Sequence, residues 1–164
     1  MISSEQVPLF KAAKYVLESW GLGPIRPPAD DAAAETPPAE DSIAAEVKFS
    51  SSTIYGSVAG LVSKTQFEKI VQEMIGPDEI VDVTLLKDAV GELINTIAGN
   101  YLTEAFGSKI QFELAPPRNI PPEEWNGSRR CSAAVPGLVE TSITLQHDGS
   151  AIFLSAEYLK PLIE

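Results

Sequence analysis

Residues 88–100 of the chain read Asp-Ala-Val-Gly-Glu-Leu-Ile-Asn-Thr-Ile-Ala-Gly-Asn, which is the pattern of an amphipathic helix. At about 100° per residue, four polar or small residues fall within about 60° of one another. They are Asp88, Glu92, Asn95 and Gly99. The opposite side is apolar, as packing on a core requires, and comprises Leu86, Val90, Leu93, Ile94 and Ile97. The Glu92 carboxylate and the Asn95 amide therefore stand next to each other on the outer side.

The segments on either side of this helix, which we expect to span residues 83–106, carry helix and strand patterns of their own. Apolar residues at helical spacing predict further helices at residues 4–20 and 65–75. Alternation predicts strands at residues 45–50, 53–62 and 110–114, and a hairpin at residues 139–146 and 151–157. Long helices beside hairpin-connected strands indicate an α+β fold, with a mainly antiparallel sheet and long helices packed on one face.

Local signals mark the ends of these elements. Capping-box patterns begin two of the helices, at Ser3/Gln6 and Thr65/Glu68. Glycines are expected to end the helices, at Gly21, Gly76 and Gly107. Two further glycines are expected to leave room for a helix against the second strand, at Gly56 and Gly60. The turn of the hairpin is assigned to Asp148-Gly149, and residues 116–130, rich in proline, are expected to be irregular.

Length and composition predict one domain spanning residues 1–164. Residues 22–42 hold five prolines and five acidic residues among several alanines. Such a segment buries too little apolar surface to order itself, so we expect a flexible acidic Pro/Ala-rich loop there. The loop is interpreted as an insertion between the first helix and the sheet.

Charge and cysteine content limit the classes of partner. The net charge of −11 argues against nucleic acid or an anionic membrane, because both would repel the chain. The sequence shows no signal-peptide pattern, and the single cysteine, Cys131, is consistent with a reducing compartment. We therefore expect a cytoplasmic protein. His147 is the only histidine, and the sequence predicts no metal site.

The helix around Glu92 resembles the signature helix of the CheC/CheX/FliY group of chemotaxis phosphatases. That signature is Asp or Ser, three residues, Glu, two residues, Asn, and a proline roughly twenty residues later. It matches Asp88, Glu92 and Asn95 here, with Pro116 or Pro117 as the proline. The spacing alone does not choose between the two prolines, and Pro117 is taken as the candidate. Gly91, Ile97, Ala98, Gly99 and Asn100 also resemble the family's helix.

The resemblance implies an enzyme that dephosphorylates a CheY-type response regulator. By resemblance, Asn95 would orient the attacking water, and Glu92 would pair with the receiver's lysine. Asp88, Gly99 and Pro117 would support the site or contact the partner. The family needs no cofactor of its own, because the Mg²⁺ ion belongs to the response regulator.

The positions of the asparagines indicate that the chain resembles CheX more than CheC. CheC-type members carry two signature helices, whereas the four asparagines of this chain leave no second Glu/Asn pair in the other helices. CheX-like proteins have one site per subunit and work as homodimers. The alternative is a non-catalytic CheX-like module that binds a response regulator or a flagellar-switch partner. Intact Glu92 and Asn95 favour the enzyme.

Overall fold

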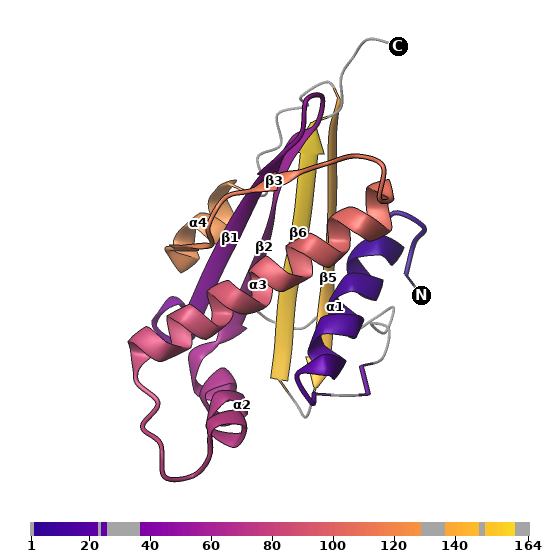
Figure 1. The fold of residues 1–164 in the computed structure, drawn as a ribbon. Coiled ribbons are helices and arrows are strands. Elements are labelled where there is room, and N and C mark those ends of the chain that lie inside the picture. The colour runs from indigo at the N-terminus through magenta and orange to yellow at the C-terminus, as the bar shows by residue number, and fades with distance from the viewer. Residues whose placement is uncertain (1, 23, 26–36, 129–136, 148–149, 160–164) are drawn as a thin grey trace.

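The computed structural model describes residues 2–22, 24–25, 37–128, 137–147 and 150–159 (Figure 1). The helices are α1 (Val7–Ser19), α2 (Lys64–Ile75), α3 (Val83–Phe106) and α4 (Pro122–Ser128), with a short 3-10 helix at Ala39–Asp41. The strands are β1 (Ser42–Ser50), β2 (Tyr55–Ser63), β3 (Glu113–Leu114), β4 (Arg118–Ile120), β5 (Leu138–His147) and β6 (Ser150–Leu159). The predicted α+β class is confirmed.

The described strands form one six-stranded sheet in the order β3-β1-β2-β6-β5, and β4 also pairs with β1. All of these pairings are antiparallel. The predicted hairpin of β5 and β6 is confirmed, with His147 opposite Ser150. Its two turn residues, Asp148 and Gly149, lie outside the described residues.

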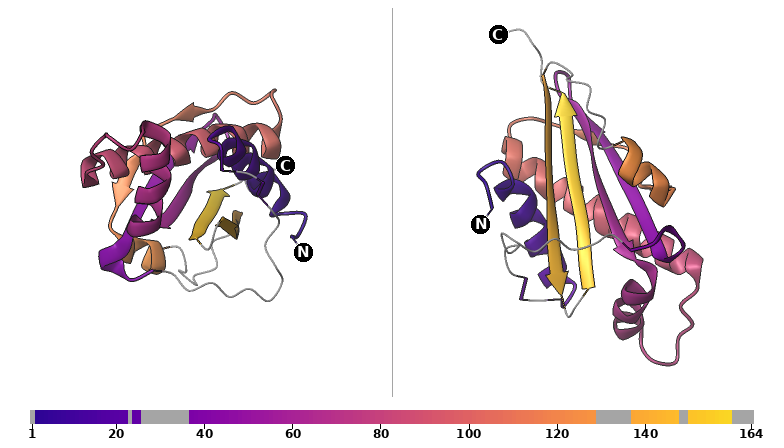
Figure 2. Two further views of the ribbon diagram at one scale, coloured as in Figure 1. Left: turned by 90° about the horizontal axis from the view of Figure 1, so that it is seen from below. Right: turned by 180° about the vertical axis from the view of Figure 1, so that it is seen from behind.

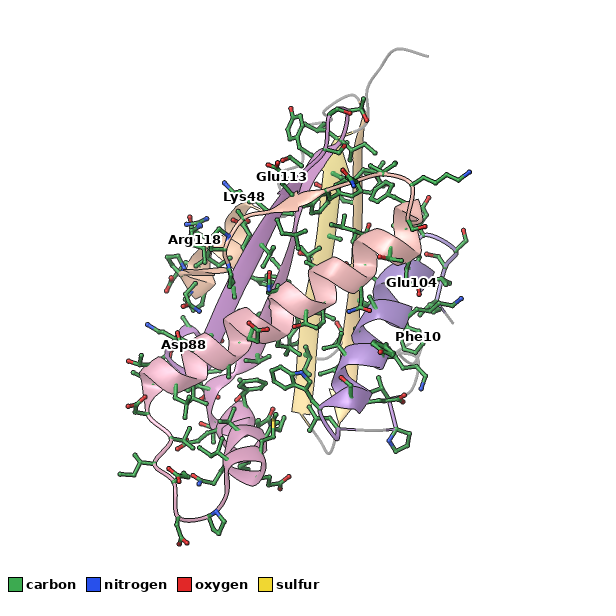
Figure 3. All side chains as sticks on the ribbon, in the orientation of Figure 1. Phe10, Lys48, Asp88, Glu104, Glu113 and Arg118 are labelled. Atoms are coloured by element: carbon green, nitrogen blue, oxygen red, sulfur yellow. The ribbon has the colours of Figure 1, made fainter. Side chains whose placement is uncertain are left out.

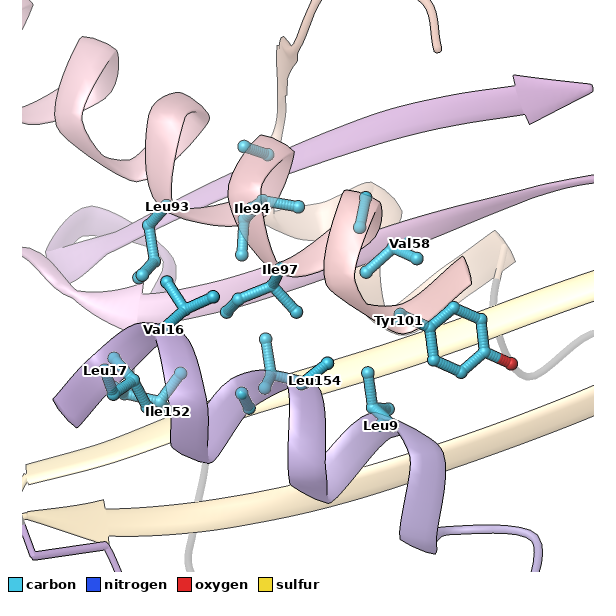
Figure 4. Packing of buried hydrophobic residues seen from close by; sticks show 14 of the residues in the cluster. Leu9, Val16, Leu17, Val58, Leu93, Ile94, Ile97, Tyr101, Ile152 and Leu154 are labelled. Carbon is cyan, nitrogen blue, oxygen red and sulfur yellow. The ribbon is translucent and has the colours of Figure 1, made fainter. Parts of the chain in front are cut away.

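Helices α1 and α3 lie side by side on one face of the sheet, as the view from behind also shows (Figure 2). Their apolar sides and the inner residues of the strands make up the main core, which Figure 4 shows from close by. The five residues predicted to form the apolar side of α3 (Leu86, Val90, Leu93, Ile94 and Ile97) are all buried. The two long helices α1 and α3 therefore pack on one face, as predicted.

Gly60 on β2 determines how closely α3 approaches the sheet. A Cβ atom at this position would lie 2.4 Å from Cδ1 of Ile94, so the glycine is needed for the contact. The room predicted for a helix is confirmed at Gly60. At Gly56 the prediction is wrong, because the close neighbour there is the adjacent strand β6. A Cβ atom at Gly56 would lie 2.0 Å from the Glu157 carbonyl oxygen.

A second, smaller apolar cluster covers part of the other face of the sheet. Trp125 of α4 packs there against outer residues of β1, β2, β4 and β6. The strand partners are Ala44, Leu61, Ile120 and Phe153, together with Ala59. Helix α4 and strand β4 fall within residues 116–130, so the expectation of an irregular stretch is wrong for most of its length.

The strand predicted at residues 110–114 is reduced to Glu113–Leu114. Phe112 packs instead against rings of two other elements, with its centroid 5.6 Å from Phe49 and 5.3 Å from Phe106. Its apolar side chain therefore contributes to the aromatic packing at this end of α3 without being part of a strand.

The two predicted capping boxes have different outcomes. At the N-terminus, the Ser3 amide donates to Gln6 Oε1 (2.8 Å) and the Gln6 amide donates to Ser3 Oγ (3.3 Å), as predicted. Helix α2, however, is capped by Ser63, whose hydroxyl oxygen accepts from the Gln66 amide at 3.2 Å. The Thr65/Glu68 box is wrong because the helix begins one residue before Thr65.

Both ends of the expected loop at residues 22–42 contact the rest of the domain. Leu22 and Ile25 are buried in the main core. Asp41 accepts hydrogen bonds from the hydroxyl groups of Ser63 and Thr65, at 2.7 and 2.6 Å. The predicted loop is therefore too long at its two ends, and residues 26–36 between them lie outside the described residues.

Candidate functional site

The candidate site lies on α3, whose ends are set by local chemistry. Asp82 begins the helix, and its carboxylate accepts from the Leu85 amide at 2.8 Å. Gly107 ends it with a φ of 77°, a conformation that favours glycine. The predicted bounds of this helix, residues 83–106, are confirmed.

The polar side of α3 faces away from the sheet, as predicted. Asp88 and Glu92 are exposed, while Asn95 and Gly99 are partly exposed. Figure 3 labels Asp88 on the first half of the helix. The backbone hydrogen bonds and buried opposite side of α3 hold this row in a fixed order, so Glu92 and Asn95 are presented side by side to the solvent.

Glu92 has a neighbour on the following turn that was not among the predicted site residues. The Thr96 hydroxyl donates to the Glu92 carbonyl oxygen at 2.8 Å and lies 3.4 Å from Glu92 Oε1. Among the ion pairs between described residues, none involves Glu92. Its carboxylate is exposed on the outer side of α3.

Pro117 is the proline that lies against the signature helix. A Cβ atom added to Gly91 would lie 3.3 Å from Pro117 Cβ and 3.6 Å from Pro117 Cγ. The absence of a side chain at Gly91 thus allows the proline to approach α3 one residue before Glu92. The structure brings Pro117 next to the candidate residues, although it lies 26 positions after Gly91 in the chain.

Strand β4, directly after this proline, attaches the same segment to α3 and to the sheet. The Asn119 side-chain amide donates to the Lys87 carbonyl oxygen at 3.3 Å. On the other side, Arg118 pairs with Glu46 of β1 at 3.0 Å. Figure 3 shows Arg118 and Lys48 along this edge of the sheet. Asn119 was not among the site residues predicted from the sequence, because alternation along so short an extended segment is a weak signal.

Other site types have less support among the described residues. No three His, Cys, Asp or Glu side chains come together there in a way that would hold a metal ion. None of the described helices has the length and apolar character needed to cross a membrane. Cys131 lies outside the described residues, as does the side chain of His147.

Comparison with known proteins gives a family and a fold. Residues 43–136 match the family model described as chemotaxis phosphatase CheX. No curated protein matches the chain. Among solved structures, a chain of the CheX-CheY-BeF3-Mg²⁺ complex from Borrelia burgdorferi is 18% identical, with a TM-score of 0.64, covering 96% of this chain and 99% of that chain.

Two further solved structures have the same fold. The chemotaxis protein CheX from Vibrio vulnificus is 14% identical, with a TM-score of 0.67, covering 95% of this chain and 97% of its own. CheX from Desulfovibrio desulfuricans is 18% identical, with a TM-score of 0.63, covering 97% of this chain and 100% of its own. The family match extends over more than half of the sequence, and the chain therefore belongs to the chemotaxis phosphatase CheX family.

Proposed function

We propose that this protein is a phosphatase that removes the phosphoryl group from a phosphorylated CheY-type response regulator. The observation that carries the proposal is the outward-facing pair of Glu92 and Asn95 on a helix whose opposite side is buried against the sheet. Membership of the CheX family supports it. So does the likeness to a chain of a complex that contains CheY, BeF3 and Mg²⁺.

Asn95 is assigned to the chemical step. An aspartyl phosphate is hydrolysed when water attacks phosphorus in line with the leaving oxygen, and catalysis consists mainly of positioning and electrostatics. A side-chain amide can accept a hydrogen bond from that water through its oxygen and donate one through its nitrogen without ionising. Asn95 would enter the receiver's active site and align the water with the phosphorus atom.

Glu92 is assigned to anchoring the partner. Its exposed carboxylate, one turn from Asn95, would pair with the receiver lysine that contacts the phosphoryl group. This pairing would fix the amide of Asn95 relative to the phosphorus atom. The Mg²⁺ ion that neutralises the phosphate would be held by the receiver.

The other signature residues have supporting roles in this proposal. Asp88 lies one turn before Glu92 on the same side and would contact the partner. Among the described residues, no atom beyond the nearby backbone of the helix lies within 4 Å of the position that a Cβ at Gly99 would take, which would leave space for the partner over the last part of the site. Pro117 shapes the edge of the site beside Gly91. A homodimer and a cytoplasmic location remain predictions.

The second candidate is a non-catalytic module of the same family that binds the receiver without hydrolysis. One experiment separates the two. Phosphate loss from a Mg²⁺-bound, phosphorylated CheY-type receiver is followed with and without the protein. In parallel, binding is measured to the same receiver carrying beryllium trifluoride in place of the phosphoryl group. Faster phosphate loss supports the phosphatase, whereas binding without acceleration supports the module and contradicts the proposal.

A further inference from the structure

Residues 115–119, which lead from β3 into β4, contact α3 at two points. Asn119 donates to the Lys87 carbonyl oxygen, and Pro117 lies against Gly91. Lys87 and Gly91 are four residues apart, so they stand above one another on one side of the helix. Pro117 and Asn119, which are two residues apart, thus contact two successive turns of α3.

The spacing of these contacts predicts which residue of the helix lies beside the next part of the segment. Four helical residues advance by about 6 Å, and two residues of extended or polyproline chain advance by about 6–7 Å. The two steps nearly match, and the segment runs in the opposite direction to the helix. Extended by one more step from Asn119 at Lys87 and Pro117 at Gly91, this spacing would set Ala115 beside the next position of the helix, which is Asn95.

Other contacts hold this segment in place while leaving one part of it exposed. The Ala115 amide donates to the Lys48 carbonyl oxygen of β1 at 2.8 Å. At the other end, Ile120 is buried in the cluster on the far face of the sheet. Residues 115–117 between these anchors are nevertheless all exposed. The two prolines, with their fixed φ angles, further restrict the backbone.

We propose that the exposed residues 115–117 form a second wall of the receiver-docking surface, and that Asn119 is the positioning residue that holds this wall beside Asn95. The inference rests on the proposed function, since it identifies the occupant as the phosphorylated receiver. A receiver whose active site admits Asn95 would contact the wall at the same time, because the predicted alignment sets Ala115 beside that residue. Because residues 115–117 are already ordered in the free protein, they would add contact surface without a loss of conformational entropy on binding.

The test is Asn119→Asp with Asn100→Asp as its matched control. Asn119→Asp keeps the shape of the side chain but removes the donor, because a carboxylate only accepts hydrogen bonds. Asn100 makes the same kind of bond, from its amide to the Thr96 carbonyl oxygen at 2.9 Å, but entirely within α3. Both variants add one negative charge to the protein. Asn119→Ala removes the donor without adding a charge.

Two quantities are measured for each variant: KM and kcat for dephosphorylation, and Kd for the receiver loaded with beryllium trifluoride and Mg²⁺. We expect Asn119→Asp and Asn119→Ala to raise KM and Kd about three- to ten-fold. Their kcat should stay within about two-fold of the wild type, whereas a general loss of folded protein would lower kcat. Asn100→Asp should change neither KM nor Kd.

Unchanged KM and Kd in both Asn119 variants, or an equal change in Asn100→Asp, would overturn the inference. The Kd measurement keeps this result separate from a failure of the proposed function. A wild-type protein that binds the receiver but does not accelerate phosphate loss contradicts the phosphatase only, and the Kd values of the variants still decide the role of Asn119. A wild type that does neither overturns both.

Discussion

A methyl group at position 60 tests whether close packing on the sheet holds the site helix in place. In Gly60→Ala, the new Cβ would lie 2.4 Å from Ile94 Cδ1 and 3.1 Å from Leu154 Cδ2. Both of these side chains are completely buried, so neither can turn away into solvent. The helix or its side chains must therefore move to accept the methyl group.

The expected loss of stability follows from these contacts. Adding a methyl group to a well-packed core costs about 1–3 kcal/mol. Replacing glycine by alanine restricts the unfolded chain and offsets about 0.4–1 kcal/mol of this. We therefore expect a net loss of about 1–2 kcal/mol in the free energy of unfolding. For a chain of this size, that corresponds to a fall in Tm of about 2–8 °C.

Urea unfolding of the wild type, Gly60→Ala, Ile94→Val and the double variant measures this loss. Ile94→Val removes Cδ1 and alone should cost about 0.5–1.5 kcal/mol. The double variant should lose less than the sum of the single variants, because the clashing atom is gone. Gly99→Ala is the control for the glycine itself, because no atom of the described residues beyond the nearby helix backbone lies within 4 Å of its added Cβ. It should raise stability by about 0.5–1 kcal/mol. A Gly60→Ala protein as stable as the wild type, or single effects that simply add, would refute the reasoning.

Two further predictions concern Asp41, which caps the start of α2, and Glu92, which is proposed to bind the receiver. Hydrogen bonds from Thr65 and Ser63 lower the pKa of Asp41. The Asp41 carboxylate therefore stabilises the folded state above its unfolded pKa, and this stabilisation is lost as the pH falls through its folded pKa. Asp41→Ala should cost about 0.5–1 kcal/mol in the free energy of unfolding at neutral pH. In urea unfolding, the difference in stability between this variant and the wild type should shrink between about pH 5 and about pH 3, and a difference independent of pH would contradict this. Glu92→Gln should raise KM for the phosphorylated receiver about ten- to hundred-fold, because it removes the charged partner of the receiver's lysine. Glu104→Gln, at the exposed far end of α3, is the control and should leave KM unchanged. Equal KM values in both variants would argue against the assignment of Glu92.

The helix that carries the site was predictable because its signals are local. The apolar period of α3 continues without interruption from Leu86 to Ile97, and Gly107 ends the helix through its own backbone conformation. The burial of that side and the exposure of Glu92 follow from the same period. Neither requires knowledge of what the helix packs against.

The elements between α3 and the β5–β6 hairpin were less predictable, because their neighbours are distant in sequence. The alternation at residues 110–114 reflects the packing of Phe112 against two aromatic rings, and only Glu113–Leu114 pair as a strand. Helix α4 begins with Pro122 followed by two acidic residues, a favourable start for a helix that was interpreted as part of a loop.

Distance in sequence also explains which part of the candidate site could be predicted and which could not. Glu92 and Asn95 lie within one turn of one helix, so their proximity follows from the sequence. The contact of Pro117 with Gly91 and the bond from Asn119 to Lys87 join residues far apart in the chain, the latter 32 positions apart. The pairing of β4 with β1 holds these residues close to α3.

The central claim is that Asn95 carries out the chemical step of receiver dephosphorylation. The most direct measurement is a single-turnover assay of phosphate loss from a Mg²⁺-bound, phosphorylated CheY-type receiver, with saturating wild-type or Asn95→Ala protein. We expect the wild type to accelerate phosphate loss and Asn95→Ala to lose about 100-fold or more of that acceleration. The variant should keep the unfolding free energy of the wild type within about 0.5 kcal/mol, because the side chain is only partly buried. An Asn95→Ala protein that accelerates phosphate loss as fast as the wild type would contradict the claim.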